Sequence, residues 1–182
     1  GGSQDNGTSV MKGVNRDWID WLGADGMESF VDWSNTNNLY GTTQNGGLYK
    51  STNGGNSYNG ITKPADDGNW VTPFEQDPTN SSTIYTGYIE VWKSTDKGAN
   101  WIAISSFGGG NLSNLKIAAS NNQYIYASEG STLKVTSNGG SSWNSYSNTW
   151  GGGTVKYITV HPTAPARVAV VTSSGIYESF NA

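Results

Sequence analysis

Short apolar runs alternate with polar, turn-rich segments along the whole chain, and this pattern predicts strands rather than helices. Four β-rich runs are NLYGTT, TIYTGY, YIYASE and RVAVVT, and a further apolar run precedes each of them: SFVDW, VTPFEQ, LKIAAS and KYITVHP. The segments between the runs are rich in Gly, Asn, Asp and Pro, which favour tight turns. Apolar stripes at helical spacing are scarce. The pattern therefore predicts an all-β protein.

A nine-residue phrase recurs through the chain as KSTNGGNSY (50–58), KSTDKGANW (93–101) and VTSNGGSSW (135–143). A fourth copy begins near the C-terminus, so that Ser51, Ser94, Thr136 and Ser179 follow one another at intervals of 43, 42 and 43 residues. A fixed period in the forties is typical of β-propellers, in which each repeat forms one four-stranded antiparallel blade. The repeat therefore predicts a propeller.

The repeat also predicts where the blades begin and end. We expect full blades at 29–61, 69–104 and 114–146, and partial blades at 1–22 and 155–182. About four blades are covered. Because repeats are stabilised by stacking on their neighbours, we expect this segment to belong to a six- to eight-bladed or double propeller, with the remaining blades of the same chain as its partners. A closed four-bladed ring, completed by the N-terminal strand near Trp18–Trp21, stays open as an alternative.

The phrase has the pattern Ser/Thr-x-Asp/Asn-x-Gly-x-x-Trp/Tyr, which predicts a self-satisfied turn with an aromatic anchor. The Asp or Asn accepts backbone amides of its own turn, and the Gly supplies a positive φ. Asn in place of Asp in two copies removes the charge that a cation would need, so we expect no metal. The positions with this structural role are Ser51, Asn53, Gly55, Tyr58, Ser94, Asp96, Gly98, Trp101, Thr136, Asn138, Gly140, Trp143 and Ser179.

These turns resemble the Asp-box, or bacterial neuraminidase repeat, of sialidases, sortilin-type receptors and xyloglucanase-like propellers. The stretches GGSQDNGTSV and GADGMESFVDWSNTNNLYGTTQNGGLYKSTNGG look like sortilin-like propellers of secreted bacterial proteins, many of which carry a sorting domain for type IX secretion. The resemblance implies a secreted or cell-surface bacterial protein. It also implies that the boxes lie on the rim opposite the functional pocket.

The candidate ligand contacts are therefore expected in the other set of connections, those after the second and the fourth strand of each blade. Aromatic rings and carboxylates gather there, as in many sugar-binding sites. The ligand-binding candidates are Trp70, Trp150, Gln44, Tyr88, Glu90 and Glu129, and the weak catalytic candidates are Asp25, Asp66 and Asp67. The alternative interpretation, which stays open, is that the acids only stabilise their own turns.

Composition narrows the chemistry. The chain has 182 residues and a net charge of −4, which argues against nucleic acid. It has no apolar run that could span a bilayer and no cysteine. The one histidine, His161, cannot form a catalytic triad or a zinc cluster. Arg16 and Arg167 are too few for the arginine triad that a sialidase-like site needs. We expect no cofactor.

The sequence thus favours a non-catalytic propeller region of a large secreted or cell-surface protein that presents loops for binding carbohydrate (glycan) or protein. One alternative is part of a xyloglucanase-like glycoside hydrolase, whose catalytic carboxylates are shared with further blades. A second alternative is a structural spacer. The same fold serves enzymes and non-enzymes, so the fold alone does not decide between them.

Overall fold

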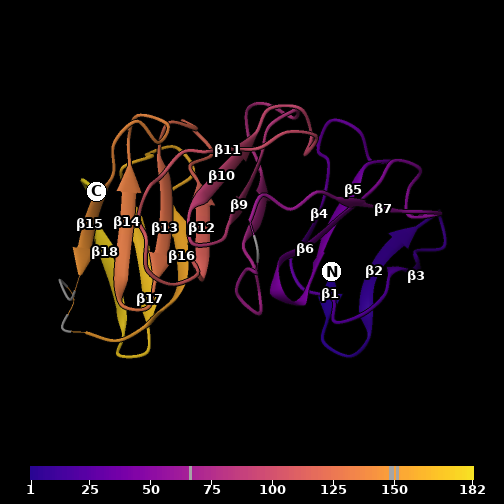
Figure 1. Ribbon diagram of the computed structural model, residues 1–182, viewed down its shortest axis with the longest axis horizontal. Coiled ribbons are helices and arrows are strands. Elements are labelled where there is room, and N and C mark those ends of the chain that lie inside the picture. Colours follow the sequence, from indigo (N-terminus) through magenta and orange to yellow (C-terminus); the bar gives the residue numbers. More distant parts are fainter. Residues whose placement is uncertain (66, 148–149, 151) are drawn as a thin grey trace.

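The computed structural model describes residues 1–65, 67–147, 150 and 152–182, and in these residues the chain forms five antiparallel sheets (Figure 1). The strands are β1 (Gly2–Ser3), β2 (Gly7–Lys12), β3 (Asp17–Leu22), β4 (Ser29–Val31), β5 (Leu39–Thr43), β6 (Gly47–Ser51), β7 (Asn59–Ile61), β8 (Phe74–Gln76), β9 (Ile84–Gly87), β10 (Val91–Ser94), β11 (Ile102–Ala103), β12 (Asn114–Ile117), β13 (Ile125–Glu129), β14 (Thr132–Thr136), β15 (Asn144–Ser147), β16 (Val155–Val160), β17 (Val168–Thr172) and β18 (Ile176–Ser179). A short 3₁₀ turn, η1 (Gln44–Gly46), joins β5 to β6.

Each sheet is a meander in which strands adjacent in sequence pair with each other. The three middle sheets have four strands each, β4-β5-β6-β7, β8-β9-β10-β11 and β12-β13-β14-β15. The end sheets have three strands, β1-β2-β3 and β16-β17-β18. The prediction of an all-β protein with four-stranded antiparallel blades is therefore confirmed.

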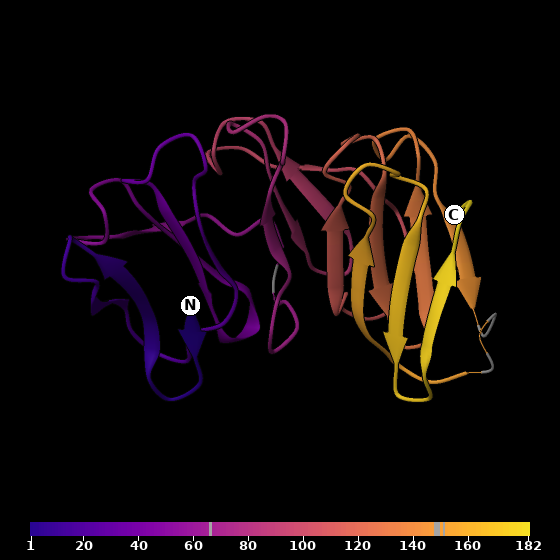
Figure 2. The same cartoon turned by 180° about the vertical axis from the view of Figure 1, so that it is seen from behind.

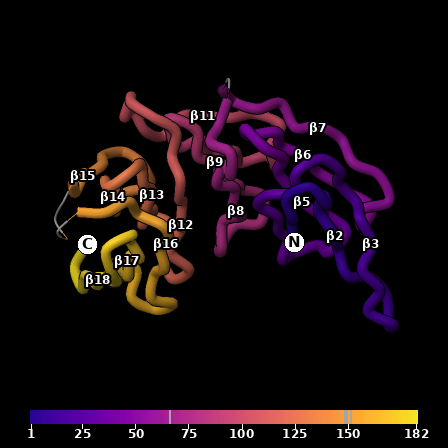
Figure 3. The backbone as a smooth tube through the Cα atoms, turned by 90° about the horizontal axis from the view of Figure 1, so that it is seen from below, coloured from indigo at the N-terminus to yellow at the C-terminus, as the bar shows by residue number. Residues whose placement is uncertain are grey.

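The sheets follow one another along an arc, with the N-terminal and C-terminal sheets at its opposite ends (Figures 2 and 3). The first strands of the second, third, fourth and fifth sheets lie side by side: β4 contacts β8, β8 contacts β12 and β12 contacts β16. These strands form the inner wall of the arc. The alternative of a closed four-bladed ring was wrong: β3, which should complete the last blade, instead pairs with β2 in its own sheet.

The core lies in the seams between neighbouring sheets, and each seam uses the same positions of the repeat. In the seam between the second and third sheets, Tyr40, Leu48 and Ile84 are buried, and Ile61 and Trp101 pack against them. In the next seam, Tyr85, Val91 and Ile125 are buried, and Ile104 and Trp143 pack against them. Each four-stranded unit thus shares its apolar surface with its neighbours.

The three repeated turns (51–58, 94–101 and 136–143) share one hydrogen-bond pattern. The hydroxyl of Ser94 donates to Asp96 Oδ1 (2.7 Å) and accepts the amide of Gly98 (2.8 Å). Asp96 Oδ1 also accepts the amide of Asn100 (2.8 Å). The hydrogen bonds from the side chain and the amide of Asn100, with that from Ser94, lower the pKa of Asp96 to about 2. Gly98 has a φ of 92°, which favours glycine.

The first aromatic anchor is less buried than the sequence predicted. Tyr58 is 45% exposed and makes edge-on contacts with Trp21 and Tyr49, at 6.2 and 5.8 Å between ring centroids. Trp143 instead donates its indole N–H to the carbonyl of Ile104 (2.8 Å) and packs edge-on against Phe107. The difference arises because Trp21 is buried in the seam between the first and second sheets. It fills part of the space that Trp101 and Trp143 fill in the next two seams.

Two buried aspartates link the sheets at the rim that carries the repeated turns, which we call the turn rim. Asp32 Oδ2 accepts hydrogen bonds from Asn38 Nδ2 (3.0 Å) and from Lys97 Nζ (2.9 Å), which comes from the next sheet's turn. Gln76, also from the next sheet, donates to Asp32 Oδ1 (3.0 Å). Asp77 of the third sheet accepts a hydrogen bond from Asn122 Nδ2 of the fourth sheet (2.9 Å). Both carboxylates are fully buried.

Candidate functional site

The connections after second and fourth strands meet at the other rim, which we call the loop rim. The amide of Asn45 donates to the carbonyl of Trp70 (3.4 Å), and the amide of Gly68 donates back to Asn45 (3.2 Å). Further along, the amide of Leu112 donates to the carbonyl of Tyr88 (2.7 Å). Each of these bonds joins a loop that connects two successive sheets to a turn between the second and third strands of a sheet. The candidate residues in these loops and in these turns therefore lie at the same end of the molecule.

A shallow pocket of about 330 Å³ opens on the loop rim and brings two of the predicted residues together. Gln44 and Asp67 line it with Tyr49, Lys63 and Asn45. Asp67 forms an ion pair with Lys63 (2.9 Å), and both side chains remain substantially exposed. Such a pair is worth little to stability, but it places a donor and an acceptor beside the ring of Tyr49.

Exposed apolar side chains follow the same stretch of rim. Trp70 is 46% exposed, although its backbone is tied to the 44–46 turn, and Val71 and Ile89 are also exposed. Tyr88 supports this turn from below, because it is fully buried and its hydroxyl donates to the carbonyl of Gly46 (2.6 Å). Burial, with the nearby charge of Asp67, raises the pKa of Tyr88 above its ordinary value. Tyr88 therefore offers no surface to a ligand in this structure.

The predicted carboxylates elsewhere on the loop rim bind backbone amides. Asp25 Oδ1 accepts the amide of Asp5 (2.7 Å), and Gln44 Oε1 accepts the amide of Asp25 (3.4 Å). Glu90 accepts the amides of Phe107 and Gly108 and the hydroxyl of Ser105. Burial alone would raise the pKa of Glu90, but these hydrogen bonds outweigh it and the pKa is lowered.

Glu129, the remaining carboxylate, binds loop 105–113, the same loop whose amides Glu90 accepts. It accepts the amide of Gly110 (2.5 Å) and lies 3.5 Å from Lys134 Nζ. Lys134 in turn lies over the ring of Phe107, at 4.3 Å from its centroid. Glu90 and Glu129 therefore hold loop 105–113 in place, which is the turn-stabilising role that the sequence left open as an alternative.

Two further candidates lie apart from the rim pocket. Trp150 packs against the seam between the fourth and fifth sheets, with Leu133 and Val170, instead of near Trp70. Asp66 lies outside the described residues. Of the nine sequence-predicted ligand or catalytic residues, the structure thus brings Gln44, Asp67 and Trp70 to one surface, with Asp25 beside Gln44.

Sequence reasoning missed a charged cluster on the inner wall of the arc. Glu75 of β8 forms an ion pair with Lys116 of β12, whose ammonium group also lies 5.9 Å from the ring centroid of Tyr157 on β16. Burial alone would lower the pKa of Lys116, but the charge of Glu75 and its hydrogen bond raise it. The signal was present in the sequence, because Glu and Lys interrupt the apolar runs VTPFEQ and LKIAAS at corresponding positions.

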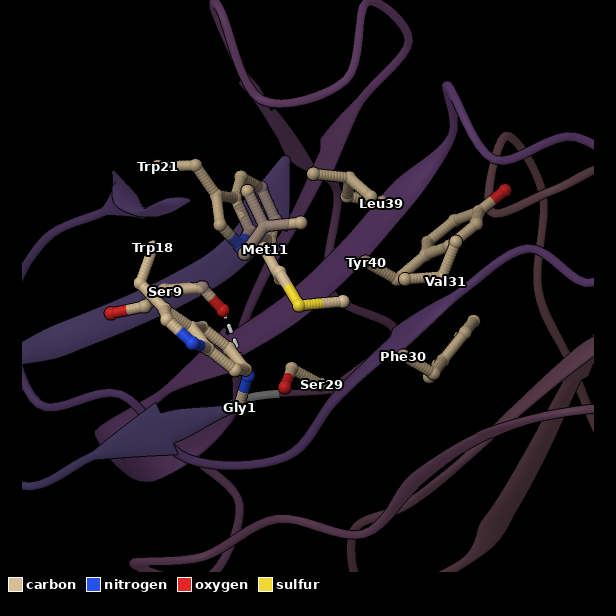
Figure 4. Close-up of a pocket in the computed structure, with 11 residues that line it drawn as sticks. Gly1, Ser9, Met11, Trp18, Trp21, Ser29, Phe30, Val31, Leu39 and Tyr40 are labelled. Atoms are coloured by element: carbon tan, nitrogen blue, oxygen red, sulfur yellow. Dashed lines mark hydrogen bonds between the residues drawn. The ribbon is translucent and has the colours of Figure 1, made fainter. Parts of the chain in front are cut away.

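A second hollow, of about 370 Å³, lies between the first and second sheets and is mainly apolar. Figure 4 shows that Met11 and Trp18 of the first sheet face it from one side, and Phe30 and Tyr40 of the second sheet from the other. Its boundary includes the N-terminal amino group, which donates to the carbonyl of Ser9 (2.8 Å). None of the sequence-predicted ligand or catalytic residues lines this hollow.

Within the described residues, no group of three or more His, Asp or Glu side chains is placed to hold a metal ion. In the same part of the chain, no helix has the length and apolar character that a membrane span requires.

Comparison with known proteins identifies the fold class. No family model matches the chain, and no curated protein matches it. Its fold is similar to the GH74 xyloglucanase from Xanthomonas campestris, with a TM-score of 0.74, 18% identity, and coverage of 97% of this chain and 33% of that one. It is also similar to the extracellular domain of a putative hybrid two-component system from B. thetaiotaomicron, with a TM-score of 0.74, 14% identity, and coverage of 96% and 25%.

A third similar structure is YCF48 bound to D1 peptide, with a TM-score of 0.55, 20% identity, and coverage of 79% of this chain and 46% of that one. The chain spans between 23% and 33% of the length of the GH74 chains that it matches. The sheet topology, the arc and these likenesses together define a β-propeller fold, with four to five blades represented in whole or in part.

Proposed function

We propose that this chain is a non-catalytic Asp-box β-propeller region whose loop rim binds glycan or protein in a secreted or cell-surface protein. The observation that carries the proposal is the surface around the 44–46 turn. There an exposed indole, Trp70, lies beside a shallow pocket with hydrogen-bonding groups from Gln44, Lys63 and Asp67. An aromatic ring next to polar groups suits a ligand with both apolar faces and hydroxyl or amide groups.

The behaviour of the rim carboxylates supports binding over catalysis. A general acid needs a carboxyl group with a raised pKa, and a nucleophile needs a carboxylate with free access. Glu90 has a lowered pKa and spends its oxygens on loop amides, while the described contacts of Asp25 and Asp67 are to a backbone amide and to Lys63. Glu90 and Asp25 thus hold loops in place, as a ligand-binding surface needs, whereas the exposed carboxylate of Asp67 stays within reach of a ligand.

The test is a change of Trp70 to Ala. We expect it to weaken binding to any glycan that scores positive on an array by at least about tenfold, because the half-exposed indole is the one aromatic side chain among Trp70, Val71 and Ile89 on this surface. The matched control is Trp33→Ala, which removes a 57% exposed indole on the turn rim. Because Trp33 also donates to Asp77, thermal melts of both variants must show that they are folded. Equal binding by the two folded variants would contradict the proposal.

The alternative proposal, part of a glycoside hydrolase, is favoured by the likeness to GH74 structures. Under that reading, Asp25 or Asp67 contributes one carboxylate and further blades contribute the other. We expect the full-length protein to show no xyloglucan hydrolysis that depends on Asp25 or Asp67, because their described contacts are to a backbone amide and to Lys63. A loss of about 10³-fold in kcat in folded Asp25→Ala or Asp67→Ala, measured by reducing-sugar release, would favour the hydrolase.

The proposed location outside the cell rests on resemblance. The extracellular domain of the two-component system has the same fold, and the turns 51–58, 94–101 and 136–143 resemble the Asp-boxes of sortilin-like secreted bacterial proteins. A spacer role without any ligand remains the outcome if neither glycans nor proteins bind.

A further inference from the structure

A groove of about 300 Å³ lies between the last two strands of the second sheet and the repeated turn of the third sheet. Both of these sheets have four strands, so the groove is not formed by an end of the chain. We call it the lysine groove, because Lys50 and Lys97 line it from the two sheets. The other polar side chains that line it are those of Thr52, Asn59, Thr62 and Asp96.

Strand pairing brings Lys50 to this groove. It pairs with Tyr40 of β5 on one side and with Asn59 of β7 on the other, and paired residues share one face of a sheet. The ammonium group of Lys50 lies 5.4 Å from the centroid of the Tyr40 ring, which is buried in the seam. Within the described residues, no carboxylate forms an ion pair with Lys50. The half-buried Lys50 thus has a ring face as its partner instead of a counter-ion.

Lys97 brings a second ammonium group to the same groove. Its Nζ donates to Asp32 Oδ2 (2.9 Å), so its charge is matched by a fully buried carboxylate. Burial, and then the charge of Lys97, lower the pKa of Lys50, and the charge of Asp32 opposes them only in part. One carboxylate therefore serves two ammonium groups, and Lys50 is the group whose charge is left unmatched.

The next seam shows that the second lysine is particular to this groove. Lys93 takes the place of Lys50 there, and its Nζ lies 5.6 Å from the centroid of the Tyr85 ring. The place of Lys97 in the following turn is taken by Gly139. The seam between the third and fourth sheets therefore has one ammonium group where the lysine groove has two.

The side chains that line the lysine groove fit a tetrahedral oxyanion. A lysine ammonium acts as a point charge with three donors, whereas a planar carboxylate is matched best by arginine. Two threonine hydroxyls and the amide of Asn59 add further donors to the lining. Among the described lining residues, the one carboxylate is that of Asp96, and both its oxygens already accept hydrogen bonds within its own turn. The net charge of −4 disfavours a polyanion.

We propose that the lysine groove binds one sulfate or phosphate group of a small ligand, with Lys50 as the charged contact. The oxygens of this group accept hydrogen bonds from the ammonium of Lys50 and from the hydroxyl and amide groups of the lining. Lys97 stays paired with Asp32 and adds to the positive potential. The ligand supplies the counter-ion that the half-buried Lys50 lacks, which lowers the cost of holding its charge away from water.

Titration with inorganic sulfate and, separately, with inorganic phosphate tests the site, with sodium chloride holding the ionic strength constant. We expect saturable NMR shifts of the amides of Gly98 and Ala99, which line the groove, with a Kd on the order of 5 mM. The pKa of Lys50, read from its Cε–Hε signals, should rise as the anion binds. The two titrations show which oxyanion is preferred. Absence of saturation with both would overturn the proposal.

Acetate tests the class of anion under the same conditions. We expect it to bind at least about threefold more weakly than the preferred tetrahedral anion, because it offers fewer oxygens to the donors of the groove. Equal binding of acetate would overturn the assignment to a sulfate or phosphate group.

Two lysine variants locate the binding. Lys50→Met keeps the apolar stem and removes the charge, so the affinity should fall at least about fivefold. Lys93→Met is the matched control, because it removes the same charge from the same place in the next repeat, and it should leave the affinity unchanged. Thermal melts show whether both variants are folded. Equal losses in the two folded variants would overturn the proposal, since the anion would then respond only to the total charge.

Asp96→Asn should change the affinity in the opposite direction. The other two turns have Asn53 and Asn138 at this position, and their Oδ1 atoms accept the same turn amide, so the turn is kept. Removing a negative charge from the lining should tighten anion binding at least about twofold. Unchanged or weaker affinity would overturn the proposal, because the anion would then lie away from this groove. Glycan binding at Trp70 is measured separately, so failure here leaves the proposed function intact.

Discussion

Changing Trp101 to Ala is expected to lower the free energy of unfolding by about 3–5 kcal/mol, the usual loss for a large aromatic removed from a core. Trp101 packs against Tyr40, Leu48, Phe74 and Ile84, so its removal leaves a cavity in a seam shared by two sheets. Small domains are stable by only about 5–15 kcal/mol, so the effect is a large fraction of the total. Urea unfolding followed by circular dichroism measures it directly.

Trp18→Ala provides the matched control for this measurement. Trp18 lies on β3, the last strand of its sheet, as Trp101 directly precedes the last strand of the third sheet, but its side chain is 66% exposed, so we expect a loss below about 1 kcal/mol. A similar loss at Trp18 and Trp101 would show that the seams do not carry the stability. That result would remove the basis for describing the fold as a series of sheets held together by their anchors.

The second large effect is expected at Asp32, where the change to Ala should cost about 3 kcal/mol. The carboxylate is fully buried and accepts hydrogen bonds from Lys97, Asn38 and Gln76, two of which come from the neighbouring sheet. Removing it takes this acceptor from Lys97 and Asn38 and from the amide and hydroxyl of Ser34. It also leaves Gln76 Nε2 with only the carbonyl of Ser81. Asp17→Ala, at an exposed carboxylate at the start of β3, should change stability by less than about 0.5 kcal/mol.

Asp32 also predicts how stability depends on pH. Burial by itself would raise the pKa of Asp32, but hydrogen bonds from Lys97, Asn38 and Gln76 outweigh it and hold the pKa far below its usual range. A carboxyl group with a depressed folded-state pKa stabilises the fold above its unfolded pKa of about 4 and loses that contribution as the pH falls further. The unfolding free energy should therefore fall between about pH 5 and pH 2.

The Asp32→Asn variant isolates this contribution. It keeps the shape of the side chain but removes its titrating group, so its stability should fall less steeply over the same pH range than that of the wild type. Urea midpoints at half-unit pH steps make the comparison. Parallel curves for the two proteins would mean that other carboxylates, such as Asp96 with its pKa of about 2, dominate the acid response.

The repeat predicted the fold because its information is local. Strand runs, turn residues and the interval between Ser51, Ser94 and Thr136 each depend on neighbours in sequence, and antiparallel meanders join such neighbours directly. The end of the blade at which a loop lies also follows from the alternation of strand direction. For this reason Gln44, Asp67 and Trp70 could be placed near one another before the structure was known.

The directions of the side chains could not be predicted, because they depend on backbone amides contributed by other loops. Glu90 and Glu129 lie at the predicted end, but the conformation of loop 105–113 turns its N–H groups toward them. Asp32 was missed although Asp77 occupies the corresponding place in the next repeat. Its role depends on Lys97 and Gln76 of a neighbouring sheet, a contact that no single repeat encodes.

The seams have a consequence for how such a molecule changes during evolution. Each one is built from two adjacent sheets, so duplication or loss of one repeat leaves every other seam with its original partners. The turns at 51–58, 94–101 and 136–143 share one pattern of residues, so an added repeat brings the anchor that its own seam needs. Gene rearrangement can therefore lengthen or shorten this arc one unit at a time without redesigning its interior.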